Sequence, residues 1–294
     1  MLSSLLLSYK ADSVDSCIPE HGEKLLVFLQ RKYPGLSVRR IKEGISHHSC
    51  TVNGRIELFP SRRLVREDLV IYTEPTLSLM QQSILYEDDY LVCIDKPAGL
   101  LSSPAALTSL FGNRANVWKF VHRLDKETSG VLLLAKGVEM QKTLEDLFRK
   151  KTIDKEYLAI VQGVIRQKQG VIHTFLTPKK MYQGQTLYES AKEGRQAITK
   201  WRLLSIAKGV SLVLCTPITG RTHQIRVHMS EMEHPVLGDS LYGGKASPLS
   251  CTRHLLHAHV LRFVHPVLHN AMEITAPLPE DFLQAFIKLQ LSYR

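Results

Sequence analysis

The chain has 294 residues, of which 44% are hydrophobic and 22% charged, and this composition excludes a wholly disordered protein. Its length favours two domains and allows enough burial for stability without disulfides or metals. The 38 Lys and Arg residues outnumber the 28 Asp and Glu, and the net charge of +10 favours a polyanionic partner, nucleic acid ahead of an acidic membrane surface.

The sequence also argues against membrane insertion and secretion. Its longest apolar runs, such as residues 131–135 and 210–215, fall far short of the ~20 residues that a membrane-spanning helix needs. No basic residue precedes the leucines at positions 5–7, so we expect no secretory signal. The five cysteines are scattered and lack the close spacing of a zinc or redox pair. We therefore expect a cytoplasmic monomer with no membrane contact.

After an N-terminal extension, residues 1–22, a first compact module is predicted over residues 23–74. Apolar residues between Leu25 and Leu29 recur at helical spacing, and Pro34-Gly35 ends that helix. Asn53-Gly54 lies between two strand-like runs and predicts a hairpin, with residues 69–72 as a closing strand.

This module is basic, with ten Lys and Arg against six Asp and Glu. Ser37 can cap a second short helix that carries Arg39, Arg40 and Lys42. Two helices beside a small sheet resemble the alpha-L RNA-binding module, and this resemblance implies that the three cations contact RNA. The alternative is a solvated charged helix beside an ordinary hairpin.

A linker is predicted over residues 75–82, where no periodicity persists, and a second domain over residues 83–294. Strands are predicted at residues 90–94, 153–161, 197–204 and 210–215, and helices at residues 140–150 and 279–289. Strands and helices alternate without a regular βαβ rhythm, which favours an α+β fold with a mixed or largely antiparallel sheet and flanking helices.

One segment of the second domain, HRLDKETSGVLLLAK at residues 122–136, places a single carboxylate before a turn and a fully apolar strand. Asp125 is thereby exposed on a loop that is anchored by a buried element, a common position for catalytic residues. The spacing alone also fits an aspartate that caps the loop.

The same segment resembles the catalytic signature of the RluA family of pseudouridine synthases, in which HRLD, two variable residues and TSG follow one another. Four further segments resemble family motifs in the same order and extend the resemblance over nearly all of residues 83–294: EDDYLVCIDKPAGLL at 87–101, KEYLAIVQG at 155–163, GRTHQIRVHMSEMEHPVLGDSLYG at 220–243, and LLHAHVLRFVHP at 255–266. An alpha-L module in front of this domain is usual in members that modify large-subunit ribosomal RNA.

The resemblance implies a cofactor-free isomerisation of uridine to pseudouridine. The bond from ribose C1′ to the base breaks, the base turns, and C5 of the base joins C1′. A carboxylate near C1′ can stabilise or capture the developing positive charge, and the resemblance assigns this role to Asp125. Whether a covalent sugar ester or a glycal forms is open. Arg221 is expected to pair with Asp125, because an adjacent cation favours the ionised carboxylate. Tyr157 is expected to stack on the target base and shuttle a proton, and it can equally be a packed aromatic.

The resemblance also implies that the target nucleotide is extruded from the RNA. Arg123 resembles the residue that fills the vacated space; its alternative is a surface salt bridge. His122 beside it is expected to contact the substrate. Lys96 is expected to support the catalytic loop as a structural or RNA-facing cation.

Two dense groups of histidines, at positions 223–234 and 254–269, raise the alternative of a metallohydrolase. Their spacing lacks the acidic partner of an HExxH arrangement, and His257 and His259 would share one face of a strand. We therefore expect no metal and no cofactor.

Two other functions remain open on the sequence alone, a catalytically silent RNA-binding or ribosome-assembly factor and an RNA chaperone. The target is expected to be ribosomal RNA, with transfer RNA as the alternative. One departure from the family concerns Ser102-Ser103-Pro104, where many relatives have a histidine before the proline.

Overall fold

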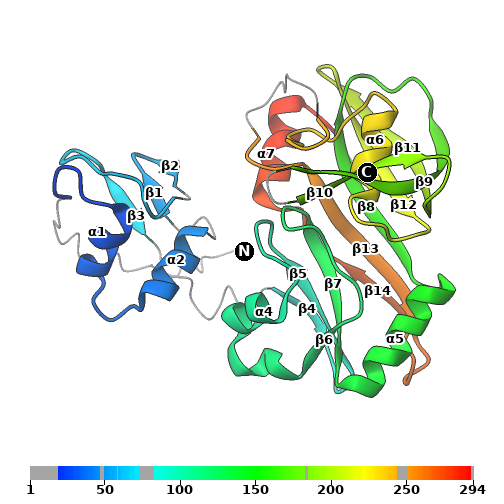
Figure 1. Cartoon of the computed structure of the whole chain (residues 1–294), viewed down its shortest axis with the longest axis horizontal. Helices are drawn as coiled ribbons and strands as arrows, with labels where there is room; N and C mark the ends of the chain where they lie inside the picture. The colour runs from blue at the N-terminus through cyan, green and yellow to red at the C-terminus, as the bar shows by residue number, and fades with distance from the viewer. Residues whose placement is uncertain are drawn as a thin grey trace, which may run out of the picture. The chain divides into compact units, whose positions relative to one another are not determined.

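The computed structural model describes residues 19–46, 50–57, 59–72, 83–182, 185–243 and 251–292, and the chain divides into two compact units, residues 1–76 and 77–294 (Figure 1). Residues 1–18 of the expected N-terminal extension and the whole expected linker, 75–82, lie outside the described residues. Within the described part of the chain, no helix is long and apolar enough to cross a membrane.

Unit 1 contains two helices and a three-stranded sheet in the order β2-β1-β3. Its elements are α1 (Leu25–Lys32), α2 (Val38–Ser46), β1 (Cys50–Val52), β2 (Arg55–Ile56) and β3 (Val70–Tyr72). Asn53 and Gly54 both have positive φ, 53° and 74°, as a tight hairpin between β1 and β2 requires. The apolar faces of the helices and the sheet close over one core that includes Phe28, Ile41 and Leu64. The elements predicted over residues 23–74 are present.

Unit 2 is built on an 11-stranded sheet. Its main path runs β10-β9-β11-β12-β8-β13-β7-β5-β4, with β14 paired to β13 and β6 paired to β7. The strands are β4 (Ile84–Glu87), β5 (Leu91–Lys96), β6 (Trp118–Phe120), β7 (Ser129–Lys136), β8 (Asp154–Gln162), β9 (Gln169–Tyr182), β10 (Gln185–Ala191), β11 (Arg195–Ala207), β12 (Val210–Pro217), β13 (Leu256–Val264) and β14 (Ala271–Thr275). The pairings are antiparallel except for β13 with β7, which confirms the predicted α+β class with a mixed, largely antiparallel sheet.

Helices cover both faces of this sheet, and central strands such as β7 and β12 are buried on both faces for that reason. On β7, Leu133 packs into the core that also contains Leu144, whereas Leu132 and Leu134 pack on the opposite face. The helical elements are α4 (Pro104–Phe111), the 3-10 helix η1 (Gly112–Val117), α5 (Val138–Lys150), α6 (Gln224–Glu231) and α7 (Glu280–Leu289). Residues of α5 and α7 pack on one face, and residues of α4 and α6 on the other.

The strands and helices predicted for the second domain are present, with ends shifted by a few residues. The helices α4 and α6 and the strands β4, β6, β9, β10 and β14 were not predicted. Ser103 and Pro104 explain the start of α4: the Ser103 side chain accepts a hydrogen bond from the Ala106 amide, and Pro104 occupies the first turn. The departure from the family pattern at this point therefore begins a helix.

Candidate active site

Unit 2 contains a cavity of about 480 Å³, large enough for a small organic ligand. It lies where the loop before β7, the strand β8, the C-terminal end of α5 and the turn that leads into α6 come together. The walls include Arg123, Asp125, Phe148, Lys155, Tyr157, Arg221, His223 and Arg226. Segments that are about a hundred residues apart in sequence thus line one site.

Asp125 stands on a tight loop directly before β7. The Thr128 amide donates to the Asp125 carbonyl oxygen at 3.1 Å, which closes the turn. Gly130, the last residue of the TSG triplet, has a φ of 109°, and a Cβ there would collide with the backbone of Ala258 on β13. Only glycine fits this approach of two parallel strands. The signature sequence therefore sets both the turn and the strand that anchors the carboxylate.

Buried polar contacts hold this loop from two sides. Lys96 is fully buried, and its ammonium donates to the carbonyl oxygens of Pro97 at 2.8 Å, Leu100 at 2.9 Å and Lys126 at 3.1 Å. On the other side, Arg253 donates to the carbonyl oxygen of Glu127 at 2.9 Å. Lys96 thus supports the loop that carries Asp125. The alternative of an RNA-facing cation does not fit this position, because the side chain has no exposed surface.

Ser102, which belongs to the segment that departs from the family pattern, contacts the same loop. Its hydroxyl donates to the Leu124 carbonyl oxygen at 2.8 Å and accepts from the Leu124 amide at 3.1 Å. Leu124 precedes Asp125, so this pair of hydrogen bonds fixes the backbone next to the carboxylate.

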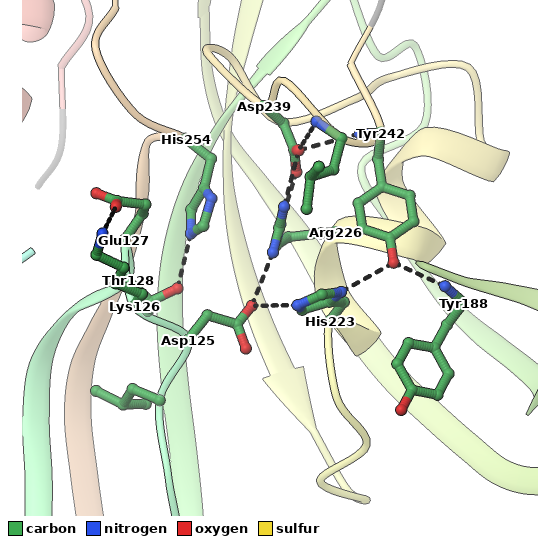
Figure 2. Close-up of polar contacts among 12 residues, drawn as sticks. Asp125, Lys126, Glu127, Thr128, Tyr188, His223, Arg226, Asp239, Tyr242 and His254 are labelled. Atoms are coloured by element: carbon green, nitrogen blue, oxygen red, sulfur yellow. Dashed lines mark hydrogen bonds and ion pairs between the residues drawn. The ribbon is translucent and has the colours of Figure 1, made fainter. Parts of the chain in front are cut away.

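Arg226 on α6 is the cation that meets Asp125. Its Nη1 donates to Asp125 Oδ2 at 3.0 Å, and its Nε and Nη2 donate to the two carboxylate oxygens of Asp239 at 2.7 and 2.9 Å (Figure 2). Asp239 is fully buried at its side chain, Arg226 is 4% exposed and Asp125 is 21% exposed. Asp239 therefore fixes the orientation of Arg226, and Nη1 of Arg226 donates to Asp125, the aspartate that faces the cavity.

The electrostatics of the Arg226–Asp239 pair follow from burial and contact. Burial alone would raise the pKa of Asp239, but the hydrogen bonds and charge of Arg226 outweigh it and lower that pKa. Burial would lower the pKa of Arg226, and the Asp239 carboxylate raises it instead. Both groups are thus charged at neutral pH.

The expectation that Arg221 pairs with Asp125 is wrong. Arg221 lies on the turn before α6, and its Nε donates to the Gln196 carbonyl oxygen at 2.9 Å. Its backbone amide is bound by the Gln224 side chain. The helix α6 begins at Gln224, so Arg221 lies before it and reaches β11, and the arginine five residues later is the one that α6 directs at Asp125. Arg221 still lines the cavity.

His223 is a second neighbour of Asp125 that the sequence did not identify. It has a φ of 58°, precedes α6, and places its Nε2 3.9 Å from Asp125 Oδ2. Burial lowers its pKa despite the opposing effect of Asp125, so the imidazole is neutral at physiological pH. Its Nδ1 lies 2.9 Å from the Tyr242 hydroxyl, which accepts from the Tyr188 amide (Figure 2). We assign the hydroxyl proton to His223 Nδ1, which leaves the ring proton on Nε2, toward Asp125.

Tyr157 and His122 both line the cavity and are both held by the protein. Tyr157 lies on β8 and packs against the apolar cores on the α4 and α6 side of the sheet. Burial raises its pKa, so its hydroxyl is protonated. His122 accepts from the Leu133 amide at 2.9 Å and stacks on Phe148, with ring centroids 4.8 Å apart. Burial lowers the pKa of His122 to about 3. This histidine is a neutral wall of the cavity.

Arg123 is exposed at the rim of the cavity and has no ion pair with any described residue. The salt bridge considered as its alternative role is therefore not formed with any described carboxylate. In unit 1, Arg39, Arg40 and Lys42 lie on α2, and Lys42 is exposed. The side chains of Arg39 and Arg40 lie outside the described residues.

The histidines of the second group serve structural contacts. His254 lies 2.8 Å from the Thr128 hydroxyl, and His257 lies 2.9 Å from the Ser129 hydroxyl. As predicted, His257 and His259 share one face of a strand, β13, with ring centroids 5.7 Å apart. Over the described ranges, no three His, Cys, Asp or Glu side chains gather in a way that could hold a metal ion.

The site also includes Asp239, which sequence reasoning missed. It lies 13 residues after Arg226, inside the long motif that carries both arginines. The same stretch contains Glu231 and Glu233, so its composition did not single out Asp239. Its buried position and bidentate contact could not be read from spacing.

Comparison with known proteins identifies the family of this chain. Residues 90–231 match the family model described as RNA pseudouridylate synthase. The chain is 30% identical over 303 residues to ribosomal large subunit pseudouridine synthase D of Haemophilus influenzae, with 92% of this chain and 93% of that protein covered. It is 32% identical over 292 residues to ribosomal large subunit pseudouridine synthase C of Rickettsia bellii, with 89% and 96% covered. Among solved structures, human RNA pseudouridylate synthase domain containing 4 is 29% identical, with a TM-score of 0.61, 74% of this chain and 96% of that chain covered. The chain therefore belongs to the RluA family of RNA pseudouridylate synthases.

Proposed function

We propose that this pseudouridine synthase isomerises uridine in large-subunit ribosomal RNA, with the Asp125 carboxylate acting at ribose C1′. The observation that carries the proposal is the asymmetry of that carboxylate. Asp125 Oδ2 accepts from Arg226 and faces His223, whereas Oδ1 accepts from no described residue (Figure 2). One oxygen is thus fixed by the protein, and the other is available to the substrate in the cavity.

The chemistry requires a negative group at this point. When the bond from C1′ to N1 of the base breaks, positive charge develops at C1′, and a carboxylate can stabilise or capture it. The bond from C1′ to C5 then forms, C5 loses its proton and N1 gains one, so no oxidant, reductant or water is consumed. Arg226 keeps the position of Asp125 fixed through these steps, and Tyr157 supplies an aromatic wall against which the base can stack while it turns.

The target uridine must leave its RNA stack to reach this cavity. Arg123 stands exposed at the rim, two residues before Asp125. A guanidinium there can stack on the bases that remain and bind phosphate at the same time. Arg123 is thus proposed to occupy the space that the extruded base leaves.

Two observations support ribosomal RNA as the target. The relatives from Haemophilus influenzae and Rickettsia bellii carry the names of large-subunit synthases D and C. In addition, unit 1 combines two helices and a small sheet with an exposed Lys42 on α2. This arrangement resembles an RNA-binding module that precedes the catalytic unit in the sequence.

The test is to incubate purified protein with unmodified large-subunit ribosomal RNA and with transfer RNA, and to map pseudouridine in both. The proposal predicts conversion at defined positions of the ribosomal RNA, and the same positions should lose pseudouridine in cells that lack the gene. Conversion of transfer RNA alone would contradict the target. A protein that binds ribosomal RNA and converts no uridine would be a silent binding factor and would contradict the activity.

A further inference from the structure

A second part of the same cavity, away from Arg226 and Asp239, is formed by cationic and aromatic side chains. Here Lys155 from β8, Phe148 and Lys151 from the end of α5, and Gly220 from the turn before α6 form the wall. The reaction at Asp125 uses none of these residues.

Lys155 is partly buried, and its ammonium forms no hydrogen bond or ion pair with any described residue. Its Nζ lies 6.0 Å from the centroid of the Phe148 ring and 4.0 Å from the point that a Cβ on Gly220 would occupy. Burial lowers the pKa of Lys155 to about 8, although Asp154 acts in the opposite direction. Lys96, by contrast, is fully buried, and its ammonium donates to three carbonyl oxygens.

A partly buried ammonium in a cavity wall costs free energy, because the charge has lost part of its water and gained no acceptor among the described residues. An anionic ligand would supply the missing acceptor and favour the charged form. The position of Lys155 therefore points to a ligand that carries negative charge into this part of the cavity.

The alternation of side chains along β8 sets the distance between the Lys155 ammonium and the base that would stack on Tyr157. Lys155 and Tyr157 are two residues apart on one strand, so both side chains point to the cavity face, roughly 7 Å apart along the strand. A nucleotide held with its base on Tyr157 and its ribose at Asp125 carries a phosphodiester on each side, within reach of a long side chain at this spacing.

We propose that Lys155 binds a phosphodiester that flanks the target uridine. This inference rests on the proposed function. It assigns to the cavity a phosphate subsite separate from the carboxylate that acts at C1′, and a role for Lys155 in holding the extruded nucleotide.

The experiment is single-turnover conversion of a ribosomal RNA fragment that contains the mapped uridine. Lys155→Met should raise the half-saturating RNA concentration roughly tenfold and leave the maximal rate nearly unchanged, because one charge-assisted hydrogen bond to the substrate is lost. The slope of log affinity against log salt should fall by about one phosphate contact. Lys155→Arg should retain most of the affinity. Lys142→Met, on an exposed part of α5, is the control for loss of one positive charge and should keep the wild-type affinity.

Modified RNA identifies the contact. A single uncharged methylphosphonate linkage is placed 5′ of the uridine, 3′ of it, or several nucleotides away. One of the two adjacent linkages should weaken binding to the wild-type protein by the same factor as Lys155→Met, and should have no further effect on that variant. Thermal unfolding of Lys155→Met should occur at the wild-type temperature or above, since a partly buried charge without an acceptor among the described residues is removed.

The outcomes separate the two proposals. Wild-type protein that converts no uridine overturns the proposed function and this inference with it. Conversion by wild-type protein with an unchanged half-saturating concentration for Lys155→Met overturns the inference alone. So does a loss of maximal rate at normal affinity, which would make Lys155 a participant in the chemistry, or equal sensitivity to the adjacent and distant linkages.

Discussion

Arg226 and Asp125 are 101 residues apart in sequence and are joined by one charged hydrogen bond of 3.0 Å at the inner end of the cavity. Arg226 is held in the position for this contact because it also donates two hydrogen bonds to the buried Asp239. Asp239 sets the orientation of the guanidinium, and the guanidinium in turn sets the orientation of the Asp125 carboxylate. The carboxylate that we propose to act at C1′ is thus held by a chain of three charges that starts in the protein interior.

The first prediction distinguishes the two arginines of the motif. Arg226→Met should reduce the maximal rate roughly 100-fold or more, because the carboxylate loses its only charged donor among the described residues. It should also cost about 3–5 kcal/mol of unfolding free energy, since Asp239 is left buried and unpaired.

Arg221→Met is the matched control, because it removes the same side chain from the same motif without touching Asp125. It should reduce the maximal rate far less than Arg226→Met. Single-turnover rates and urea unfolding on both variants give the answer. A larger loss of rate in Arg221→Met would contradict the pairing seen in the structure.

The second prediction concerns stability in acid. The native pKa of Asp239 is lowered, so its contribution to stability is complete above the unfolded-state pKa, roughly 4, and is lost as pH falls through the native pKa. Asp239→Asn should be less stable than the wild type at pH 7. Between about pH 5 and pH 3, a range that spans the unfolded-state pKa of about 4, the variant should lose less stability than the wild type. Urea denaturation at a series of pH values measures this. Two parallel curves would show that the pair does not couple to protonation.

The third prediction concerns Lys96. Lys96→Met removes the ammonium donor from the carbonyl oxygens of Pro97, Leu100 and Lys126 and should cost roughly 1–3 kcal/mol of unfolding free energy. Because one of these carbonyls belongs to Lys126, next to Asp125, the maximal rate should fall as well. RNA affinity should not change, since the side chain is fully buried. Normal stability with weakened RNA binding would contradict the structural role and would indicate that Lys96 contacts RNA.

The fourth prediction separates the two units. If α2 contacts the phosphate backbone, replacing Arg39, Arg40 and Lys42 with alanine should weaken RNA binding and flatten its salt dependence by up to about three phosphate contacts. The maximal rate at saturating RNA should change little, because the cavity belongs to unit 2. Single-turnover kinetics at several salt concentrations measure both quantities. A triple variant with normal affinity and an unchanged salt slope would make α2 a solvated charged helix.

Local patterns predicted much of the fold. Asn53-Gly54 specified a hairpin because both residues tolerate positive φ, and the alternating strands gave the elements of the sheet. The strand order could not be predicted, because β13 joins β7 to β8 through contacts between residues about a hundred or more positions apart. The helix α4 was missed because its eight residues give too short a periodic pattern.

The site was predicted only in part, for a similar reason. The motif around Asp125 identified the carboxylate, and the segment from Gly220 to Gly243 contained its cation. Which arginine reaches Asp125 depends on where α6 begins and on the left-handed residue His223 before it. Lys96 was placed beside the catalytic loop, but its burial depends on three carbonyl oxygens that the fold brings together.

The central claim is that the Asp125 carboxylate performs the reaction at C1′, and the most direct test is single-turnover conversion of large-subunit ribosomal RNA by Asp125→Asn. This change removes the negative charge and nearly preserves the shape of the side chain. We predict no pseudouridine above background, with the dissociation constant for RNA within about threefold of the wild type. Asp125→Asn protein that forms pseudouridine at a rate near that of the wild type would contradict the account.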